Sequence, residues 1–371
     1  MDICHLNKWI PNLKRPLVIA GPCSAETEEQ VLETAKALVQ IEDVRIFRSG
    51  IWKPRTRPNS FEGVGEKGLP WLKRVKEETG LLVTTEVANA HHVELALKHD
   101  IDILWIGART TVNPFSVQEI ADAIKGTNIP VMVKNPINAD LSLWMGAIER
   151  LNLAGINKIV AIHRGFSTAD KSEYRNAPLW RIPIELKRQL PDLPIICDPS
   201  HITGARDRVA LVCQKAMDVD MDGVMVETHP TPEKAWSDAA QQVTPHMLSE
   251  IIISLKLKTE FSTDRGFEQE LGELREQIDR IDSEILESLK MRFNIVERIG
   301  NLKMKNKVTA LQVNRMDKMY KRIASLSEKI GLRSQFAEEL YNVVHEESVK
   351  LQTEMMRSFL KENTDKENNN S

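Results

Sequence analysis

The sequence predicts an α/β fold, a (β/α)8 TIM barrel, followed by a small all-α domain of three helices. Eight short apolar runs occur in the first 230 residues, and helical stretches lie between them. A parallel strand that is buried on both faces has a continuous apolar run of this kind. Eight strand–helix units in roughly 250 residues suit a (β/α)8 barrel. The runs are LVIA (17–20), VRIF (44–47), LLVTT (81–85), ILWIGA (103–108), PVMV (130–133), KIVAI (158–162), PIIC (194–197) and GVMV (223–226).

The pattern of apolar residues changes beyond the last strand–helix unit. Apolar residues at 271, 274, 278, 281, 285 and 289 step by three and four, which predicts an amphipathic helix of more than 30 residues. Such a helix cannot bury its apolar stripe alone and needs partners. Two more helical patterns follow at about 312–328 and 334–360. The predicted parts are a barrel domain (1–256), a polar linker (257–270), a helical domain (271–360) and a disordered tail (361–371).

Composition and charge argue against several classes of partner. The 371 residues carry a formal net charge of −3, and 42% of them are hydrophobic. A nucleic-acid-binding surface would need a basic excess. No apolar stretch approaches the roughly 20 residues that span a bilayer, and the N-terminal MDICHLNKWIPN lacks the apolar core of a secretory signal. We expect no nucleic-acid or membrane partner, a cytoplasmic location and four reduced cysteines.

Four potential metal ligands fall at one end of the predicted barrel. Cys23, His201 and Glu227 follow strands one, seven and eight, and Asp238 lies in the loop after Glu227. The active site of a (β/α)8 barrel lies at the C-terminal strand ends, so these side chains should converge. One thiol, one imidazole and two carboxylates suit Mn, Fe, Co or Zn. Separate roles as capping or solvated loop residues explain any one of the four alone, but not their common location.

Six cationic side chains follow the strands at the same end of the barrel. They would repel one another unless anions bind between them, so at least two anionic groups are expected in the site. A metal together with two anionic groups indicates a reaction that joins two phosphorylated substrates. Cations without a metal would instead suggest a sugar-phosphate binder. The six residues are Arg48, Lys53, Arg55, Arg109, Lys134 and Arg164.

The motifs at these strand ends resemble those of 3-deoxy-D-arabino-heptulosonate 7-phosphate (DAHP) synthases of type Iβ. In chain order they are AGPCS, FRSGIWKPRT, IGART, VMVKNP, HRG, DPSH, VETHP and the SD of AWSDAAQQ. The related 3-deoxy-D-manno-octulosonate 8-phosphate synthases share the barrel, but they carry an Asn-containing motif where this chain has KPRT (53–56). One departure from the family is Arg57, where a small residue is frequent.

The resemblance implies a metal-dependent condensation of phosphoenolpyruvate with erythrose 4-phosphate to DAHP and phosphate, the first step of the shikimate pathway. The implied cofactor is a divalent metal, Mn2+ first, with Co2+, Fe2+ and Zn2+ as alternatives. Its implied ligands are Cys23, His201, Glu227 and Asp238. The residues implied to hold phosphoenolpyruvate are Arg48, Lys53, Arg109, Lys134 and Arg164. Those implied for erythrose 4-phosphate are Lys53, Pro54, Arg55 and Thr56, and Lys53 would also donate a proton or charge to the developing alkoxide.

Two cations interrupt the apolar stripe of the long helix. Its rhythm continues through 289, 292, 296, 299 and 303, yet Arg292 and Lys303 occupy two of these positions. They lie about three helical turns apart, on one face. Unpaired buried cations are costly, so an anionic ligand should meet them. Ser348 and Gln352, four residues apart, share a face of the last helix. The competing interpretation is a coiled-coil dimerisation module with charges at its edges.

The helical segment from about 271 to 356 resembles chorismate mutases of the all-helical AroQ class. The resemblance rests on LREQIDRIDSEIL, Arg292, Lys303, Arg315 and the ESVKLQ segment. It implies a homodimer of intertwined three-helix chains that rearranges chorismate to prephenate. The residues implied to form one site are Arg292, Lys303, Arg315, Ser348, Gln352 and Arg275 of the partner subunit. Arg292, Lys303 and Gln352 would act catalytically, the last two on the ether oxygen.

Two positions depart from the mutase pattern, which often has Asp at Gln312 and Glu at Met316. Those acids usually help hold the substrate hydroxyl, so their loss favours weaker binding or a slower reaction. The alternative function is therefore a monofunctional DAHP synthase whose helical domain only senses a ligand and dimerises. Several reactions separate DAHP from chorismate, which argues against channelling. The fusion instead favours feedback regulation of the barrel by prephenate.

Overall fold

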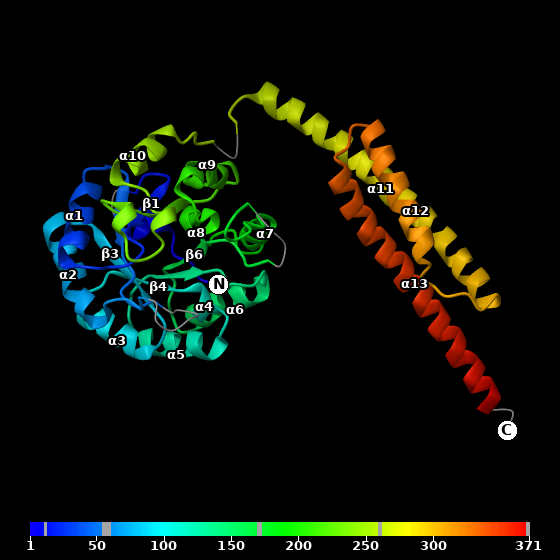
Figure 1. Cartoon of the computed structure of the whole chain (residues 1–371), viewed down its shortest axis with the longest axis horizontal. Helices are drawn as coiled ribbons and strands as arrows, with labels where there is room; N and C mark the ends of the chain where they lie inside the picture. The colour runs from blue at the N-terminus through cyan, green and yellow to red at the C-terminus, as the bar shows by residue number, and fades with distance from the viewer. Residues whose placement is uncertain (11–12, 54–60, 169–172, 259–261, 369–371) are drawn as a thin grey trace. The chain divides into compact units, whose positions relative to one another are not determined.

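The computed structural model describes residues 1–10, 13–53, 61–168, 173–258 and 262–368. The chain divides into two compact units, Met1–Glu260 and Phe261–Ser371. Figure 1 shows a ring of strands surrounded by helices in the first unit and a bundle of long helices in the second. Within the described ranges, no helix is both long and apolar enough to cross a membrane.

The strands of the first unit form a closed, fully parallel barrel in chain order, and β8 pairs with β1 to close it. This confirms the predicted TIM barrel, and each strand overlaps the apolar run that predicted it. Among the described residues the strands are β1 (Leu17–Gly21), β2 (Val44–Arg48), β3 (Leu82–Val87), β4 (Ile103–Ile106), β5 (Val131–Lys134), β6 (Ile159–His163), β7 (Ile195–Cys197) and β8 (Gly223–Glu227).

Helices follow the strands around the barrel, and several have side-chain N-caps. The Thr27, Asn89 and Asp140 side chains, for example, each accept a hydrogen bond from a backbone N–H in the first turn. The α-helices of this unit are α1 (Glu28–Leu38), α2 (Leu69–Thr79), α3 (Ala90–Lys98), α4 (Ala108–Thr111), α5 (Pro114–Ile124), α6 (Leu141–Leu153), α7 (Arg181–Gln189), α8 (Pro199–Thr203), α9 (Val209–Asp218) and α10 (Pro245–Ser254). Short 3-10 helices are η1 (Leu6–Lys8), η2 (Gly65–Gly68), η3 (Arg206–Arg208), η4 (Pro232–Lys234) and η5 (Ala239–Gln241).

Apolar side chains fill both the interior of the barrel and the layer under the helices. Successive residues of a strand point to opposite faces, so Ile19 joins the inner cluster while Val18 and Ala20 join the outer one. Trp105 and Met132 also lie in the inner cluster. Because the interior is apolar, charged side chains collect where strands end: the last residues of β2, β5 and β8 are Arg48, Lys134 and Glu227.

The second unit is built from α11 (Arg265–Lys305), α12 (Val313–Lys329) and α13 (Ser334–Asn368), and α13 packs against both other helices. Close packing is visible at Gly300, where an added Cβ would lie 3.3 Å from Gln352 Cγ. Val296 and Gly300 are the buried positions of α11 among the described residues. Most of its predicted apolar stripe is exposed in a single chain; Leu274 and Ile278, for example, are 50% and 56% exposed.

Two predicted boundaries differ from the structure. Helix α11 begins at Arg265, inside the predicted linker, because Asp264 caps it by accepting hydrogen bonds from the N–H groups of Gly266 and Phe267. No apolar stripe marks these first turns, so the periodicity missed them. Helix α13 continues to Asn368, where a disordered tail was predicted from 361. The segment contains no glycine or proline that would end a helix.

Gly21 ends β1 and leads to Cys23. Its φ is +146°, and an added Cβ would lie 2.0 Å from Arg48 O. An alanine there would overlap the backbone of β2, so the two strands could not keep their present separation.

We predict that Gly21→Ala lowers the free energy of unfolding of the barrel by about 2–4 kcal/mol, from backbone strain plus overlap. Gly146→Ala is the matched control, because nothing lies within 4 Å of its Cβ position in α6. It should be neutral or stabilising by up to about 1 kcal/mol. All seven tryptophans lie in the barrel unit, so tryptophan fluorescence during urea unfolding reports this unit. Equal stability of the two variants would contradict the strand contact.

Candidate active sites

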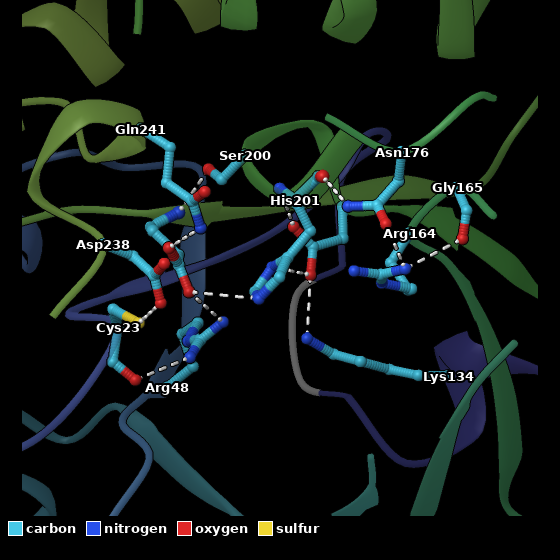
Figure 2. A network of polar contacts seen from close by, with 12 residues as sticks. Cys23, Arg48, Lys134, Arg164, Gly165, Asn176, Ser200, His201, Asp238 and Gln241 are labelled. Atoms are coloured by element: carbon cyan, nitrogen blue, oxygen red, sulfur yellow. Dashed lines mark hydrogen bonds and ion pairs between the residues drawn. The ribbon is translucent and has the colours of Figure 1, made fainter. Parts of the chain in front are cut away.

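The four predicted metal ligands meet at the mouth of the barrel. Cys23 Sγ lies 3.2 Å from Asp238 Oδ2, and His201 Nε2 lies 3.7 Å from Glu227 Oε1. Arg48 stands beside them, with Nη1 3.4 Å from Glu227 Oε1 (Figure 2). Within the described residues, the donors form these two pairs and no group of three or more that could hold a metal ion as it stands.

The charge states of these donors follow from burial and from neighbouring cations. Burial, and then the charge of Glu227, raises the pKa of Cys23 to about 12. Lys53 Nζ donates to Cys23 Sγ at 2.9 Å and to Cys23 O at 3.0 Å. Burial also raises the pKa of Asp238, but the hydrogen bond and charge of Arg175 outweigh it and hold that pKa well below its usual range. The carboxylate is therefore ionised beside a protonated thiol.

Asp198 connects the metal-ligand candidates to the cations. Its Oδ2 lies 2.8 Å from His201 Nδ1 and accepts a hydrogen bond from Lys134 Nζ at 2.8 Å. Burial raises the pKa of Asp198, but His201 and Lys134 together hold it well below its usual range. The ionised carboxylate orients the imidazole, so His201 Nε2 points toward Glu227. Sequence reasoning did not name Asp198 as a site residue, although it follows β7 directly within the quoted DPSH motif.

Four of the six predicted cations, Lys53, Arg109, Lys134 and Arg164, line a cavity of about 100 Å³ at the same mouth. Arg48 is buried, with its guanidinium carbon 4.8 Å from the centre of the Trp105 ring. Arg164 Nη1 donates to Asn176 Oδ1 at 2.8 Å, and burial lowers its pKa to about 10, so it stays charged at neutral pH. Residues lining the cavity include Lys53, Arg109, Lys134, Arg164, Arg175, His201 and Asp238.

Part of the predicted sugar-phosphate segment lies outside the described residues, namely Pro54, Arg55 and Thr56. Arg175, which was not predicted, lies in the cavity wall. Its Nη1 donates to Asp238 Oδ1 at 2.8 Å and to Gln241 Oε1 at 2.7 Å. No apolar strand immediately precedes Arg175, so the pattern that identified the other cations gave no signal for it.

The helical unit brings three of its predicted site residues together. Arg292 Nη1 donates to Ser348 Oγ at 2.7 Å, and Gln352 Nε2 donates to Ser348 O at 3.2 Å. Gln352 Oε1 is buried without a hydrogen-bond partner. Lys303 Nζ donates to Ala310 O at 2.5 Å, and burial lowers its pKa. A further polar residue, His345, has a pKa lowered by burial and then by the charges of Arg292 and Lys303.

Two predicted mutase residues are exposed in the single chain. Arg315 lies near the start of α12, and Arg275 lies 17 residues before Arg292 on α11. At 1.5 Å per residue, that separation is about 26 Å along the helix, so Arg275 and Arg292 of one chain cannot line the same small site. A cavity of about 390 Å³ lies between α11 and α13, with Arg292, Leu289 and Tyr341 in its wall.

Comparison with known proteins gives a family match for each of the two units. Residues 9–262 match the model of the DAHP synthetase I family. The chain belongs to this family. Residues 274–353 match the model of chorismate mutase type II. The recognition from sequence motifs, a DAHP synthase fused to a chorismate mutase domain, is confirmed, and the chain is an enzyme of both kinds.

The barrel also resembles individual proteins. The phospho-2-dehydro-3-deoxyheptonate aldolase of Thermotoga maritima is 35% identical over 239 residues, which are 64% of this chain and 68% of that protein. Its crystal structure, described as a DAHP synthase, has a TM-score of 0.58 at 34% identity and covers 64% of this chain and 67% of that one. A 2-dehydro-3-deoxyphosphooctonate aldolase of Legionella pneumophila is 29% identical over 279 residues, 68% of this chain and 96% of that protein.

Proposed function

We propose that the barrel condenses phosphoenolpyruvate with erythrose 4-phosphate to give DAHP and inorganic phosphate. The observation that carries the proposal is one small cavity lined by several cations beside thiol, imidazole and carboxylate donors. Arg and Lys side chains match the carboxylate and phosphate groups of such substrates. In the reaction, C3 of phosphoenolpyruvate bonds to the aldehyde carbon, water adds at C2, and the C2–O bond to phosphate breaks.

The cations of the site divide into two kinds by their contacts. Arg48 and Lys134 are buried against Glu227 and Asp198, so their positions are fixed before substrate binds. Arg109 and Arg164 line the cavity, as Lys53 and Lys134 also do, and together with Arg48 these residues would hold the anionic groups of phosphoenolpyruvate. Lys53 would donate a proton or positive charge to the alkoxide that develops from the aldehyde. Such preorganised charges stabilise a transition state without reorganising when it forms.

Cys23, His201, Glu227 and Asp238 would hold a divalent metal ion, for which we propose Mn2+, with Co2+, Fe2+ and Zn2+ as alternatives. Their donor set fits such an ion. Glu227 Oε1 is buried without a hydrogen-bond partner. Asp198 fixes the ring of His201, in the way that a carboxylate beside a metal-bound histidine commonly orients its ring. The bound ion would supply Lewis-acid polarisation of the aldehyde oxygen.

We predict that His201→Ala lowers condensation activity by more than about 100-fold, because it removes a ligand and not an outer contact. Complete chelation of the wild-type protein should have the same effect, and Mn2+ should restore only the wild type. His246→Ala, an exposed histidine 3.6 Å from Glu250 on α10, is the matched control and should keep full activity. Wild-type activity that survives complete chelation would overturn the metal assignment.

For the helical unit we propose the rearrangement of chorismate to prephenate, carried by Arg292, Lys303, Ser348 and Gln352 on facing sides of α11 and α13. Arginines would fix the two carboxylates in the reactive chair, and Lys303 and Gln352 would stabilise charge that grows on the ether oxygen. The buried, unpaired Gln352 Oε1 supports a polar ligand beside it. Arg315 would complete the site from the start of α12.

We also propose that two chains pair through this unit. The exposed stripe of α11, including Leu274 and Ile278, would become buried against the partner. Pairing of long helices would also let Arg275 of the partner subunit reach the site of Arg292, which Arg275 of the same chain cannot do. Dimerisation therefore accounts for both the exposed apolar face and the incomplete site.

Arg292→Ala should lower mutase activity by about 100- to 1,000-fold, the usual effect of losing one charged donor. Its condensation activity should stay near the wild-type value, because the barrel does not use this residue. Arg298→Ala, an exposed arginine on the same helix, serves as the control. The assay is the loss of chorismate absorbance; unchanged mutase activity in Arg292→Ala would refute this site.

Finally, we propose that prephenate bound in the helical unit inhibits the barrel by feedback. The fusion of the two enzymes in one chain supports this regulation. Coupling of this kind changes binding affinity by about 5- to 150-fold. We expect prephenate to inhibit condensation by the wild type and to lose that effect in Arg292→Ala. A condensation rate independent of prephenate over a wide concentration range would end the proposal.

A further inference from the structure

Two side chains outside the predicted site contact the carboxylates of the proposed metal site: Arg175 contacts Asp238, and Gln241 contacts Glu227. Arg175 Nη1 donates to Asp238 Oδ1 at 2.8 Å and to Gln241 Oε1 at 2.7 Å. Gln241 Nε2 in turn donates to Glu227 Oε2 at 2.6 Å. A continuous chain of hydrogen bonds therefore connects Asp238, Arg175, Gln241 and Glu227.

Each carboxylate uses its remaining oxygen differently. Asp238 Oδ2 accepts a hydrogen bond from Cys23 Sγ at 3.2 Å, and Glu227 Oε1 lies 3.7 Å from His201 Nε2 (Figure 2). Glu227 Oε1 is buried without a hydrogen-bond partner. The outer oxygens are thus held by Arg175 and Gln241. The inner oxygens face the sulfur and the imidazole, and that of Glu227 also lies 3.4 Å from Arg48 Nη1.

The segment that carries Asp238 needs such support. Asp238 has a φ of +49°, in the left-handed region that is unfavourable for a residue with a Cβ. Its neighbour Gln242 donates to Ser237 O at 2.8 Å and accepts from the Cys23 N–H at 3.1 Å. Gln242 thereby fixes the Cys23 backbone next to this segment. Both glutamines belong to the AWSDAAQQ motif, whose last two residues have no other assigned role.

We infer that Arg175 and Gln241 are positioning residues, which orient Asp238 and Glu227 so that one oxygen of each faces a divalent ion. The inference rests on the metal site proposed above. Outer hydrogen-bond partners of metal ligands typically change metal affinity 10- to 100-fold. A guanidinium also repels a nearby metal ion. Removing Arg175 would therefore tighten metal binding if repulsion were the larger effect, and weaken it if positioning were. The Arg175 side chain is 50% exposed, which screens the repulsion, so positioning dominates.

The test is a titration of the full-length protein with Co2+, in which absorbance reports the bond between the Cys23 thiolate and the metal. Arg175→Leu and Gln241→Leu should each weaken Co2+ binding about 10- to 100-fold and reduce the thiolate band. Arg175→Lys, which retains a donor and the charge, should recover part of the affinity. Arg188→Leu and Gln214→Leu are matched controls, because these side chains bond to Glu185 and Asp218 on their own helices, α7 and α9. Tryptophan fluorescence during urea unfolding checks that every variant is folded.

The possible outcomes separate this inference from the proposal on which it rests. Binding by Arg175→Leu and Gln241→Leu within twofold of the wild type, or tighter, would overturn the positioning role while leaving the metal site intact. If the wild type does not bind Co2+, or His201→Ala binds it equally well, the metal site itself fails and the positioning role fails with it.

Discussion

Charge pairing in an apolar barrel is the constraint on which the site depends. Arg48 with Glu227, and Lys134 with Asp198, are buried pairs at the ends of strands. Removing one member of such a pair leaves the other as a buried, uncompensated charge, which is strongly destabilising. The strand ends therefore fix both the metal-ligand candidates and the innermost cations in one network. This rigidity is useful for catalysis, because preorganised charges need not rearrange during the reaction.

In the helical unit, among the described residues, the cations Arg292 and Lys303 donate to neutral groups and not to carboxylates. Arg292 donates to the hydroxyl of Ser348, and Lys303 donates to the carbonyl of Ala310, which are neutral acceptors. Their positive charge thus remains available to a dicarboxylate ligand, which pairs them better than a neutral oxygen does. The barrel carries its own counter-charges, whereas in our proposal the helical unit relies on a ligand and on a second chain.

Much of the fold could be predicted because eight continuous apolar runs have few alternatives to a parallel barrel. The same logic located Arg48, Lys134 and Glu227, since residues at strand ends point into the mouth. Arg175 and Gln241 could not be found this way, because they reach the site from loops whose course depends on tertiary contacts. The start of α11 was missed for a local reason: its first turns have a cap but no apolar stripe.

Anomalous diffraction of Mn2+ in crystals of the full-length protein would test the proposed metal site directly. We expect a single strong peak in the barrel, within bonding distance of Cys23, His201, Glu227 and Asp238, with Arg175 and Gln241 still bonded to the outer carboxylate oxygens. A peak elsewhere, or none at saturating Mn2+, would contradict the proposed site.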